Sequence, residues 1–231
     1  MQTKTLIFGH RGYPKVYPEN SLAGFSYALA QGVDGLEFDV HLTKDQIPVI
    51  MHDEQIDRTT NGVGLIQQYT LAELQHFCLA NHEPIPTLAA LLQLVGQRPV
   101  QLNLEFKTDQ IQYPGIEAIV LAMVATAELT RPVIFSSFHL PTLKTCQAID
   151  ANQLYYWLTE AKLTNPSDFI QQEKLDGLHL KHYQAEAGQN QRVWTVNQVE
   201  LAAELFQRQV AGIFTDDFVQ MTDLRNQLVT N

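Results

Sequence analysis

The sequence has 231 residues, 45% hydrophobic and 17% charged, which excludes a disordered chain and allows one large domain with a substantial core. Its formal net charge of −10 argues against nucleic acid or an anionic membrane surface as partner, because basic patches drive binding to both. Cys78 and Cys146 build neither a disulfide framework nor a CxxC metal knuckle. The sequence shows no signal h-region and no run of about 18 apolar residues, so we expect a cytoplasmic protein without a membrane span, if the sequence is complete.

Short apolar or alternating runs recur between longer helical patterns along the chain. These runs predict strands at 6–8, 35–42, 49–51, 100–107, 133–136, 154–158, 177–180, 192–196 and 212–214. The helical patterns predict helices at 22–31, 88–95, 116–129, 140–149, 168–173, 198–207 and the C-terminus, with a weak helix at 70–77. We expect Asn20 to cap the first helix and Thr87 to cap the helix that ends before Gly96.

The alternation of strands and helices indicates parallel βα units. About eight strands favour a closed (β/α)8 TIM barrel over an open doubly wound sheet, and we expect residues 1–231 to form one such domain. Residues 53–86 are too long for a simple loop and are predicted to be a short insertion after the second strand. Residues 181–191 leave almost no room for a helix, which predicts a degenerate sixth crossover.

Acidic side chains gather on the inward faces of two predicted strands. A period of two places Glu37 and Asp39 on one face of the second strand, and it places Glu105 inward on the strand at 100–107. Buried carboxylates are costly unless they are paired or bind a cation, and all-oxygen ligation suits Mg²⁺, Ca²⁺ or Mn²⁺. The alternative is an ion-pair network of Glu105 with Lys107 or Arg11.

Two histidines each end a short apolar run, where barrel enzymes place catalytic groups. Because histidine titrates near neutral pH, His10 and His52 could serve as a proton donor and a proton acceptor. Arg11 offers a planar fork for phosphate oxygens, and Lys107 offers a second positive charge. His41 shares the inward face with the carboxylates but lies further along the strand, and we interpret it as structural.

Later residues complete the set of candidates. Phe138 and Trp194 could form an apolar wall for a small alcohol or could be core residues. Asn197 is a candidate polar residue for substrate binding. We expect Asp53 and Arg58 to orient the His52 loop rather than to touch substrate.

Ordered motifs along nearly the whole chain, from Gly9 to Asp216, resemble the glycerophosphodiester phosphodiesterase family. The most specific are His10-Arg11-Gly12, Pro18-Glu19-Asn20-Ser21, Gly35-Leu36-Glu37-Phe38-Asp39-Val40, Thr43-Lys44-Asp45, and His52-Asp53 followed by Arg58-Thr59-Thr60-Asn61-Gly62. Weaker matches are Ile85-Pro86-Thr87-Leu88, Asn103-Leu104-Glu105-Phe106-Lys107, Ser137-Phe138, Trp194-Thr195-Val196-Asn197 and Thr215-Asp216.

The resemblance implies a TIM barrel that hydrolyses glycerophosphodiesters, its small-molecule substrates, to sn-glycerol 3-phosphate and an alcohol. It implies His10 and His52 as the acid–base pair and Arg11 as a phosphate ligand. It also implies one divalent cation, Mg²⁺ or Ca²⁺, held by Glu37, Asp39 and Glu105 with Lys107 beside it. The substrate's own glycerol hydroxyl would be the nucleophile, through a cyclic phosphate that water then opens.

Two other functions remain open from the sequence. A phosphodiesterase acting on lysophospholipids or other phospholipid headgroups would need an apolar groove or a membrane-binding surface, and no basic amphipathic helix is evident. A non-catalytic binding barrel is also compatible with the fold, because fold alone does not determine function. The sequence does not identify the leaving alcohol or the oligomeric state.

Overall fold

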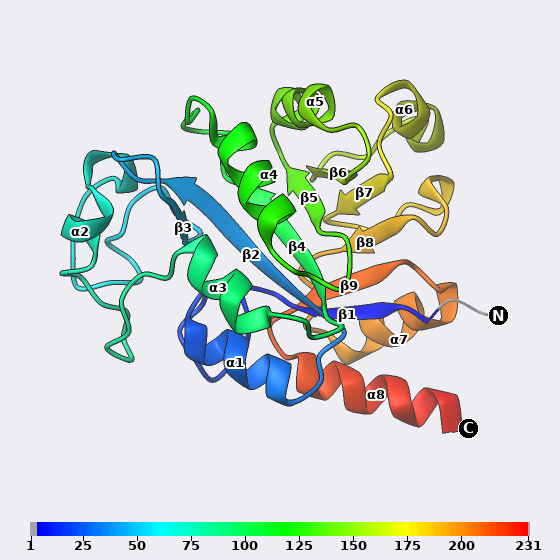
Figure 1. Ribbon diagram of the computed structural model, residues 1–231. Helices are drawn as coiled ribbons and strands as arrows, with labels where there is room; N and C mark the ends of the chain where they lie inside the picture. The colour runs from blue at the N-terminus through cyan, green and yellow to red at the C-terminus, as the bar shows by residue number, and fades with distance from the viewer. Residues whose placement is uncertain (1–3, 231) are drawn as a thin grey trace.

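Eight parallel strands close into a barrel in the computed structural model, which describes residues 4–230 (Figure 1). Strand β1 pairs with β2 on one side and with β9 on the other, which closes the ring. The barrel strands are β1 (Leu6–Gly9), β2 (Gly35–Leu42), β4 (Gln101–Phe106), β5 (Ile134–Ser137), β6 (Leu154–Thr159), β7 (Gly177–Leu180), β8 (Gln191–Val193) and β9 (Gly212–Thr215). The predicted TIM barrel is therefore confirmed.

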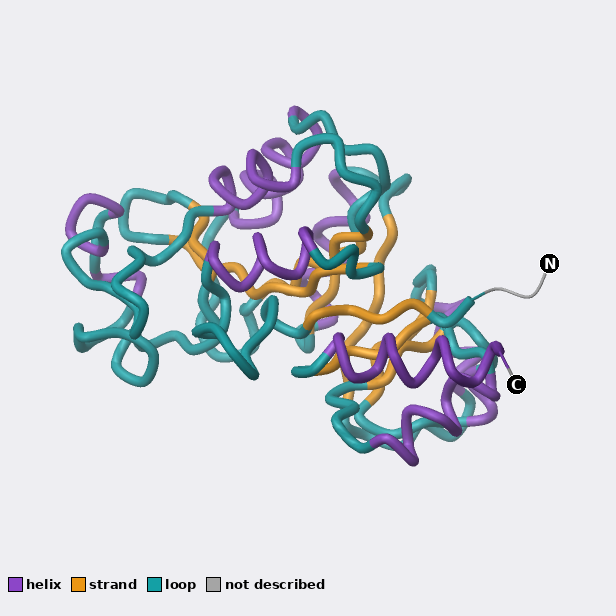
Figure 2. The backbone as a smooth tube through the Cα atoms, turned by 90° about the horizontal axis from the view of Figure 1, so that it is seen from below, coloured by secondary structure: helices purple, strands orange, loops and turns teal. Residues whose placement is uncertain are grey.

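Helices surround the barrel because the outward faces of the strands are apolar. Leu36, Phe38 and Val40 of β2 are fully buried in the main hydrophobic cluster, where Phe25 of the first helix packs against Phe38. The surrounding helices are α1 (Leu22–Ala30), α3 (Leu88–Val95), α4 (Ile116–Thr126), α5 (Leu140–Ile149), α6 (Pro166–Gln172), α7 (Val199–Arg208) and α8 (Phe218–Thr230). In the view from below, helices lie on both sides of the strands (Figure 2).

The prediction that Asn20 caps the first helix was wrong by one residue. Ser21 is the N-cap of α1, since its hydroxyl accepts a hydrogen bond from the Gly24 N–H. Asn20 instead has a left-handed backbone (φ 56°) and donates its side-chain amide to Asp39 at 2.9 Å. Asn20 thus joins the first loop to an inward carboxylate, whereas the predicted cap at Thr87 is present as expected.

The strand predicted at 49–51 does not belong to the barrel. It is β3 (Pro48–Ile50), which runs antiparallel to β2 at the edge of the ring (Figure 1). His52 therefore does not end a barrel strand, which corrects the expectation for that residue. The Met51 N–H donates to the Asp39 carbonyl, so pairing with β2 places His52 beside the barrel mouth.

Residues 53–86 have a small apolar core of their own. The 3-10 helix η1 (Ile66–Gln68) and the one-turn helix α2 (Leu71–Leu74) pack on it, and α2 is shorter than the predicted helix at 70–77. A second hydrophobic cluster fills this region with Val49, Met51, Ile56, Ile66, Leu74, Leu79 and Ile85. Between β7 and β8 there is only the 3-10 helix η2 (Ala185–Ala187), which confirms the degenerate sixth crossover.

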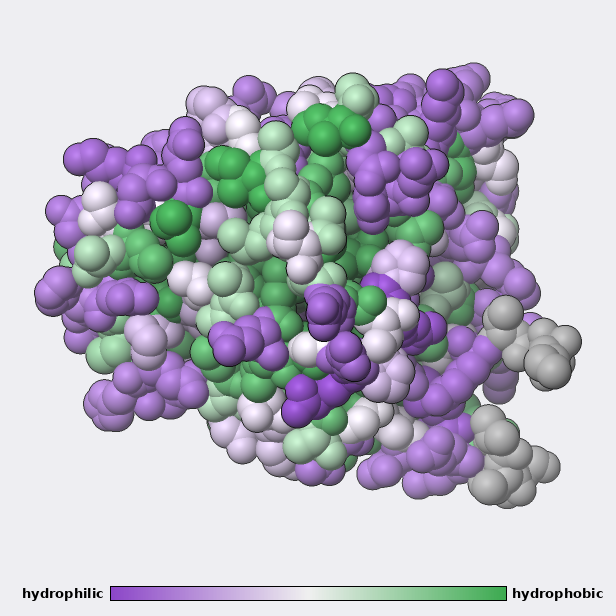
Figure 3. Space-filling model, in the orientation of Figure 1, coloured by the Kyte–Doolittle hydropathy of each residue, from purple (hydrophilic) through white to green (hydrophobic). Residues whose placement is uncertain are grey.

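The outer surface is mostly polar. On the face drawn in Figure 3, hydrophilic side chains cover the periphery and hydrophobic ones gather near the middle. The exposed large hydrophobic residues of the described chain are scattered: Val16, Val63, Ile149 and Leu228. Across residues 4–230, no helix combines the length and the apolar character needed to span a membrane.

Candidate active site

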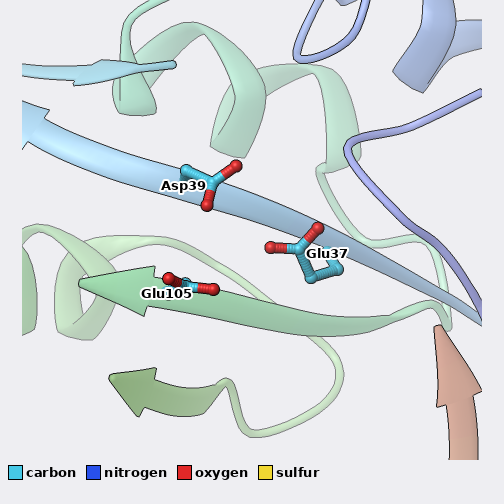
Figure 4. A group of neighbouring side chains, drawn as sticks. All are labelled: Glu37, Asp39 and Glu105. Atoms are coloured by element: carbon cyan, nitrogen blue, oxygen red, sulfur yellow. The ribbon is translucent and has the colours of Figure 1, made fainter. Parts of the chain in front are cut away.

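Three carboxylates meet inside the mouth of the barrel. Glu37 and Asp39 project from β2, and Glu105 projects from the adjacent strand β4, where it is the register partner of Asp39 (Figure 4). Each offers an oxygen, and these oxygens all lie within 4.8 Å of one another. All three residues are buried, with at most 8% of their surface exposed. The predicted inward cluster is therefore present.

The electrostatics of this cluster suit a bound cation. Burial, followed by repulsion from Asp39 and Glu105, raises the pKa of Glu37 well above its ordinary value. Burial also raises the pKa of Glu105, against the opposing effect of Lys107. One buried oxygen, Asp39 Oδ1, has no hydrogen-bond partner. An unpartnered carboxylate oxygen beside two destabilised carboxyl groups fits an oxygen-liganded divalent ion, and these residues could hold one.

Two cations accompany the three carboxylates. Burial would raise the pKa of Asp39, but the nearby Arg11 and Lys107 lower it below the ordinary value. Lys107 Nζ lies 3.0 Å from Glu105, and Arg11 Nε lies 3.6 Å from Asp39. The ion pairs proposed as the alternative to a metal thus exist in part, but two cations leave one of the three negative charges unbalanced.

Arg11 is held by its backbone as well as by its side chain. It has a left-handed backbone (φ 54°), which turns its N–H toward Glu37 for a hydrogen bond of 2.9 Å. Its guanidinium bonds to Glu19 at 3.1 Å. Such a conformation is strained for a residue with a Cβ, and here it places Arg11 and His10 together at the end of β1.

His10 has a carboxylate behind its ring. The Nδ1 atom lies 2.7 Å from Asp216 Oδ1, and Asp216 also accepts a hydrogen bond of 2.6 Å from the Asn197 amide. Hydrogen bonding to His10 keeps the pKa of Asp216 below its ordinary value, although burial opposes this effect. Because an ionised carboxylate only accepts, Nδ1 carries the proton and Nε2 remains for exchange.

His52 has a matching arrangement. Its Nδ1 lies 2.6 Å from Asp53 Oδ1, and its Nε2 lies 3.4 Å from Lys107 Nζ. Arg58 donates hydrogen bonds to Asp53 from two of its nitrogens, Nε and Nη2, and it donates another to Glu19. The hydrogen bonds from Arg58, more than the one from His52, lower the pKa of Asp53 despite partial burial. Asp53 and Arg58 therefore orient the His52 loop, as predicted.

His41 contributes structure beneath this loop. It is fully buried, and burial lowers its pKa to about 4, so the ring is neutral. Its Nδ1 pairs with the Tyr113 hydroxyl at 2.9 Å, and its Nε2 lies 3.2 Å from the His52 carbonyl oxygen. Since the carbonyl accepts, Nε2 donates, and His41 fixes the backbone of His52.

A cavity of about 190 Å³ connects these groups. Phe138 and Trp194 stand on its apolar side, with ring centroids 5.5 Å apart and planes at 88°. Its described lining residues are His10, Arg11, Glu37, His52, Asn103, Glu105, Phe138, Leu158, Glu160, His179, Trp194 and Phe214. The fold thus brings both histidines, Arg11, two of the carboxylates and both aromatic candidates to one cavity.

Three candidates lie outside that lining: Asp39, Lys107 and Asn197. Lys107 Nζ lies 3.0 Å from Glu105 Oε1 and 3.4 Å from His52 Nε2, so it contacts the site through these two residues. Asn197 has its amide committed to Asp216, and its carbonyl oxygen accepts from Thr215 and from the Asp216 N–H. The sequence predicted no role in the site for Glu19, Asn20 or Asp216. Their signal is the Pro18-Glu19-Asn20-Ser21 and Thr215-Asp216 motifs, which do not show what these side chains contact.

Comparison with known proteins identifies the family. The model of the glycerophosphoryl diester phosphodiesterase family matches residues 10–220. The chain belongs to this family. It is 32% identical over 230 residues to a glycerophosphodiester phosphodiesterase of Caldanaerobacter subterraneus, covering 93% of this chain and 95% of that protein. It is 34% identical over 238 residues to a glycerophosphodiester phosphodiesterase from Bacillus altitudinis, covering 92% of this chain and 94% of that protein. The expected enzyme class is therefore confirmed.

Solved structures agree. A phosphodiesterase of Oleispira antarctica, solved with its product sn-glycerol 3-phosphate, superposes with a TM-score of 0.87 at 27% identity, over 96% of this chain and 97% of that one. A glycerophosphodiester phosphodiesterase of Thermotoga maritima gives a TM-score of 0.75 at 26% identity, over 95% and 98%. The match thus extends over the barrel and the segments that carry the cavity.

Proposed function

We propose that this family member hydrolyses glycerophosphodiesters to sn-glycerol 3-phosphate and an alcohol, with a divalent cation at the carboxylate cluster and with His10 and His52 as proton carriers. The observation that carries the proposal is the pairing of each histidine with a carboxylate through Nδ1, at one cavity that also reaches Glu37 and Glu105. The bound product of the Oleispira antarctica enzyme supports the choice of a glycerol phosphate.

Glu37, Asp39 and Glu105 would hold the cation, Mg²⁺ or Ca²⁺. When bound, the cation supplies positive charge that stabilises the extra negative charge on phosphate oxygens during cleavage. Arg11 would bind the phosphate through its planar fork. Lys107, beside Glu105 and His52, would add a second fixed positive charge on the same side.

The two histidines would divide the proton transfers. His52 has the proton of its ring on Nδ1, facing Asp53, so its Nε2 carries the one free lone pair of the ring. That lone pair faces Lys107 Nζ at 3.4 Å, and it would take the hydroxyl proton once the substrate hydroxyl replaces this contact. His10, with Asp216 at its Nδ1, would in its charged form carry a second proton on Nε2 and give it to the oxygen of the leaving alcohol as the bond from phosphorus to that oxygen breaks. The attacking hydroxyl would be the substrate's own glycerol hydroxyl, and water would then open the cyclic phosphate.

Phe138 and Trp194 would contact the substrate along the apolar side of the cavity, and Asn197 would act on it through Asp216. We also propose that the chain is one domain in which residues 53–86 are an insertion. In support, β3 links the insertion to the barrel by pairing with β2, and the insertion delivers His52 and Asp53 to the cavity.

The test is the release of glycerol 3-phosphate from a panel of glycerophosphodiesters with Mg²⁺, with Ca²⁺ and with chelator. Cation-dependent release, abolished in a folded His52→Ala variant, is the expected result. Rapid-quench phosphorus NMR should detect the cyclic phosphate. Undiminished release in chelator, after the protein is shown to be metal-free, would refute the cation's role, and full activity of His52→Ala would remove His52 from the proton transfers.

A further inference from the structure

The cavity has two chemically different sides. One side carries the histidines, Arg11 and the carboxylate cluster. The other side is apolar and is formed by Phe138, Leu158, Trp194 and Phe214. Among the described lining residues, Glu160 is the one carboxylate that is not a member of the cluster. It directly follows β6, at the rim of the apolar side.

The two aromatic rings of this side form a fixed corner. Phe138 and Trp194 meet nearly at right angles, and the Trp157 indole N–H holds the Phe138 carbonyl at 3.0 Å. The Phe138 ring already faces one cation, because the ammonium nitrogen of Lys107 lies over this ring, 5.9 Å from its centroid. A corner of two aromatic rings attracts cations through the negative faces of the rings, and it does so most strongly for weakly hydrated ammonium groups.

The Glu160 carboxylate is available to a ligand. Its side chain is 59% exposed and pairs with Lys181 Nζ at 2.9 Å, which is itself 44% exposed. Exposed pairs of this kind contribute little to stability and are screened by salt. A ligand ammonium can therefore replace Lys181 as the partner of Glu160 without a large loss.

We propose that Phe138, Trp194 and Glu160 form a subsite that selects diesters whose leaving alcohol carries an ammonium group, primary or quaternary. The inference rests on the proposed function, because a phosphate held near Arg11 and the cluster directs the leaving alcohol toward this side and the rim. The chain's net charge of −10 acts in the same direction, since it attracts cationic ligands. Glu160 is then a specificity-determining residue and has no part in bond cleavage.

The experiment compares kcat/KM for the choline, ethanolamine and uncharged glycerol diesters of sn-glycerol 3-phosphate. The quantity of interest is the ratio of kcat/KM for a cationic diester to that for the glycerol diester. We expect Glu160→Gln to lower this ratio about two- to fivefold, the size of one exposed charge interaction with a bound ammonium. Glu160→Lys should lower it further, and Lys181→Gln should preserve or raise it by freeing the carboxylate.

A matched control is Glu204→Gln, which breaks another exposed pair, with Arg208 on α7, away from the cavity lining. It should leave the ratio at the wild-type value. An unchanged ratio in Glu160→Gln, including a uniform loss on every diester, overturns the subsite while the proposed function stands. No cleavage of any diester by folded wild-type protein overturns the proposed function itself.

Discussion

Asp216→Asn tests the role of the carboxylate behind His10. The substitution keeps the shape of the side chain but replaces an ionised acceptor, 2.7 Å from His10 Nδ1, with a neutral amide. A hydrogen bond to a charged group contributes about 1.5–3 kcal/mol. Because the Asp216 side chain is 39% exposed, water screens the charge, and we take the lower half of that range. At about 1.4 kcal/mol for each factor of ten, kcat/KM should fall about 10- to 40-fold.

The assay is the initial rate of glycerol 3-phosphate release, with Tm measured on the same samples. The control is Asp168→Asn, an exposed aspartate in the first turn of α6, which should keep wild-type kcat/KM. Asn197→Ala removes one donor to the Asp216 carboxylate and the acceptor of the Thr215 hydroxyl and the Asp216 N–H, but it leaves the carboxylate beside His10, so it should cause a smaller loss than Asp216→Asn. If Asp216→Asn retained wild-type kcat/KM with an unchanged Tm, the pairing of His10 with Asp216 would have no catalytic role.

Three further predictions concern stability. Glu37→Gln removes a buried carboxylate that repels Asp39 and Glu105, so in chelator the Tm of the variant should exceed that of wild type, by about 2–4 °C for each kcal/mol gained. Added cation should no longer raise the Tm of the variant. Burial would raise the pKa of Asp34, but hydrogen bonds from Arg225, the Ile7 N–H and Lys4 hold it below its ordinary value. The ionised Asp34 therefore stabilises the fold above its unfolded-state pKa of about 3.9. This stabilisation is lost as the pH falls below that value. The free energy of unfolding in urea should therefore be lower for Asp34→Asn than for wild type at about pH 7, and the difference between the two proteins should shrink below about pH 4. Leu74→Ala should destabilise the insertion by about 2–5 kcal/mol. Relative to wild type, the variant should show faster amide hydrogen exchange in the insertion, with a smaller change in the barrel strands.

Periodicity predicted the carboxylate cluster well because strand side chains alternate strictly. Glu37 and Asp39 had to share a face, and a parallel neighbour had to bring Glu105 opposite them. The closed barrel followed from the same regularity, since alternating strands and helices leave few topologies. Residues whose positions depend only on element type were therefore predictable from the sequence alone.

Other features depend on contacts between distant segments, which periodicity does not encode. A three-residue strand reads the same whether it joins the ring or pairs antiparallel at its edge, so the sequence did not predict how β3 pairs. Asn20 reads as a helix cap, yet it uses its amide on Asp39, 19 residues away. Asp216 lies 206 residues from His10, and no local pattern predicts that pair.

The charge balance at the site explains how an acidic chain can accept an anionic substrate. Arg58 donates two hydrogen bonds to Glu19, both shorter than the one from Arg11, so Arg58 balances Glu19 and Arg11 is counted with the cluster. Three carboxylates of the cluster against Arg11 and Lys107 leave one excess negative charge, which repels phosphate. With a divalent ion held there, the balance becomes one excess positive charge. The same cluster would thus repel phosphate without its cation and attract phosphate with it, so loss of the cation should weaken binding of the glycerol phosphate product as well as turnover.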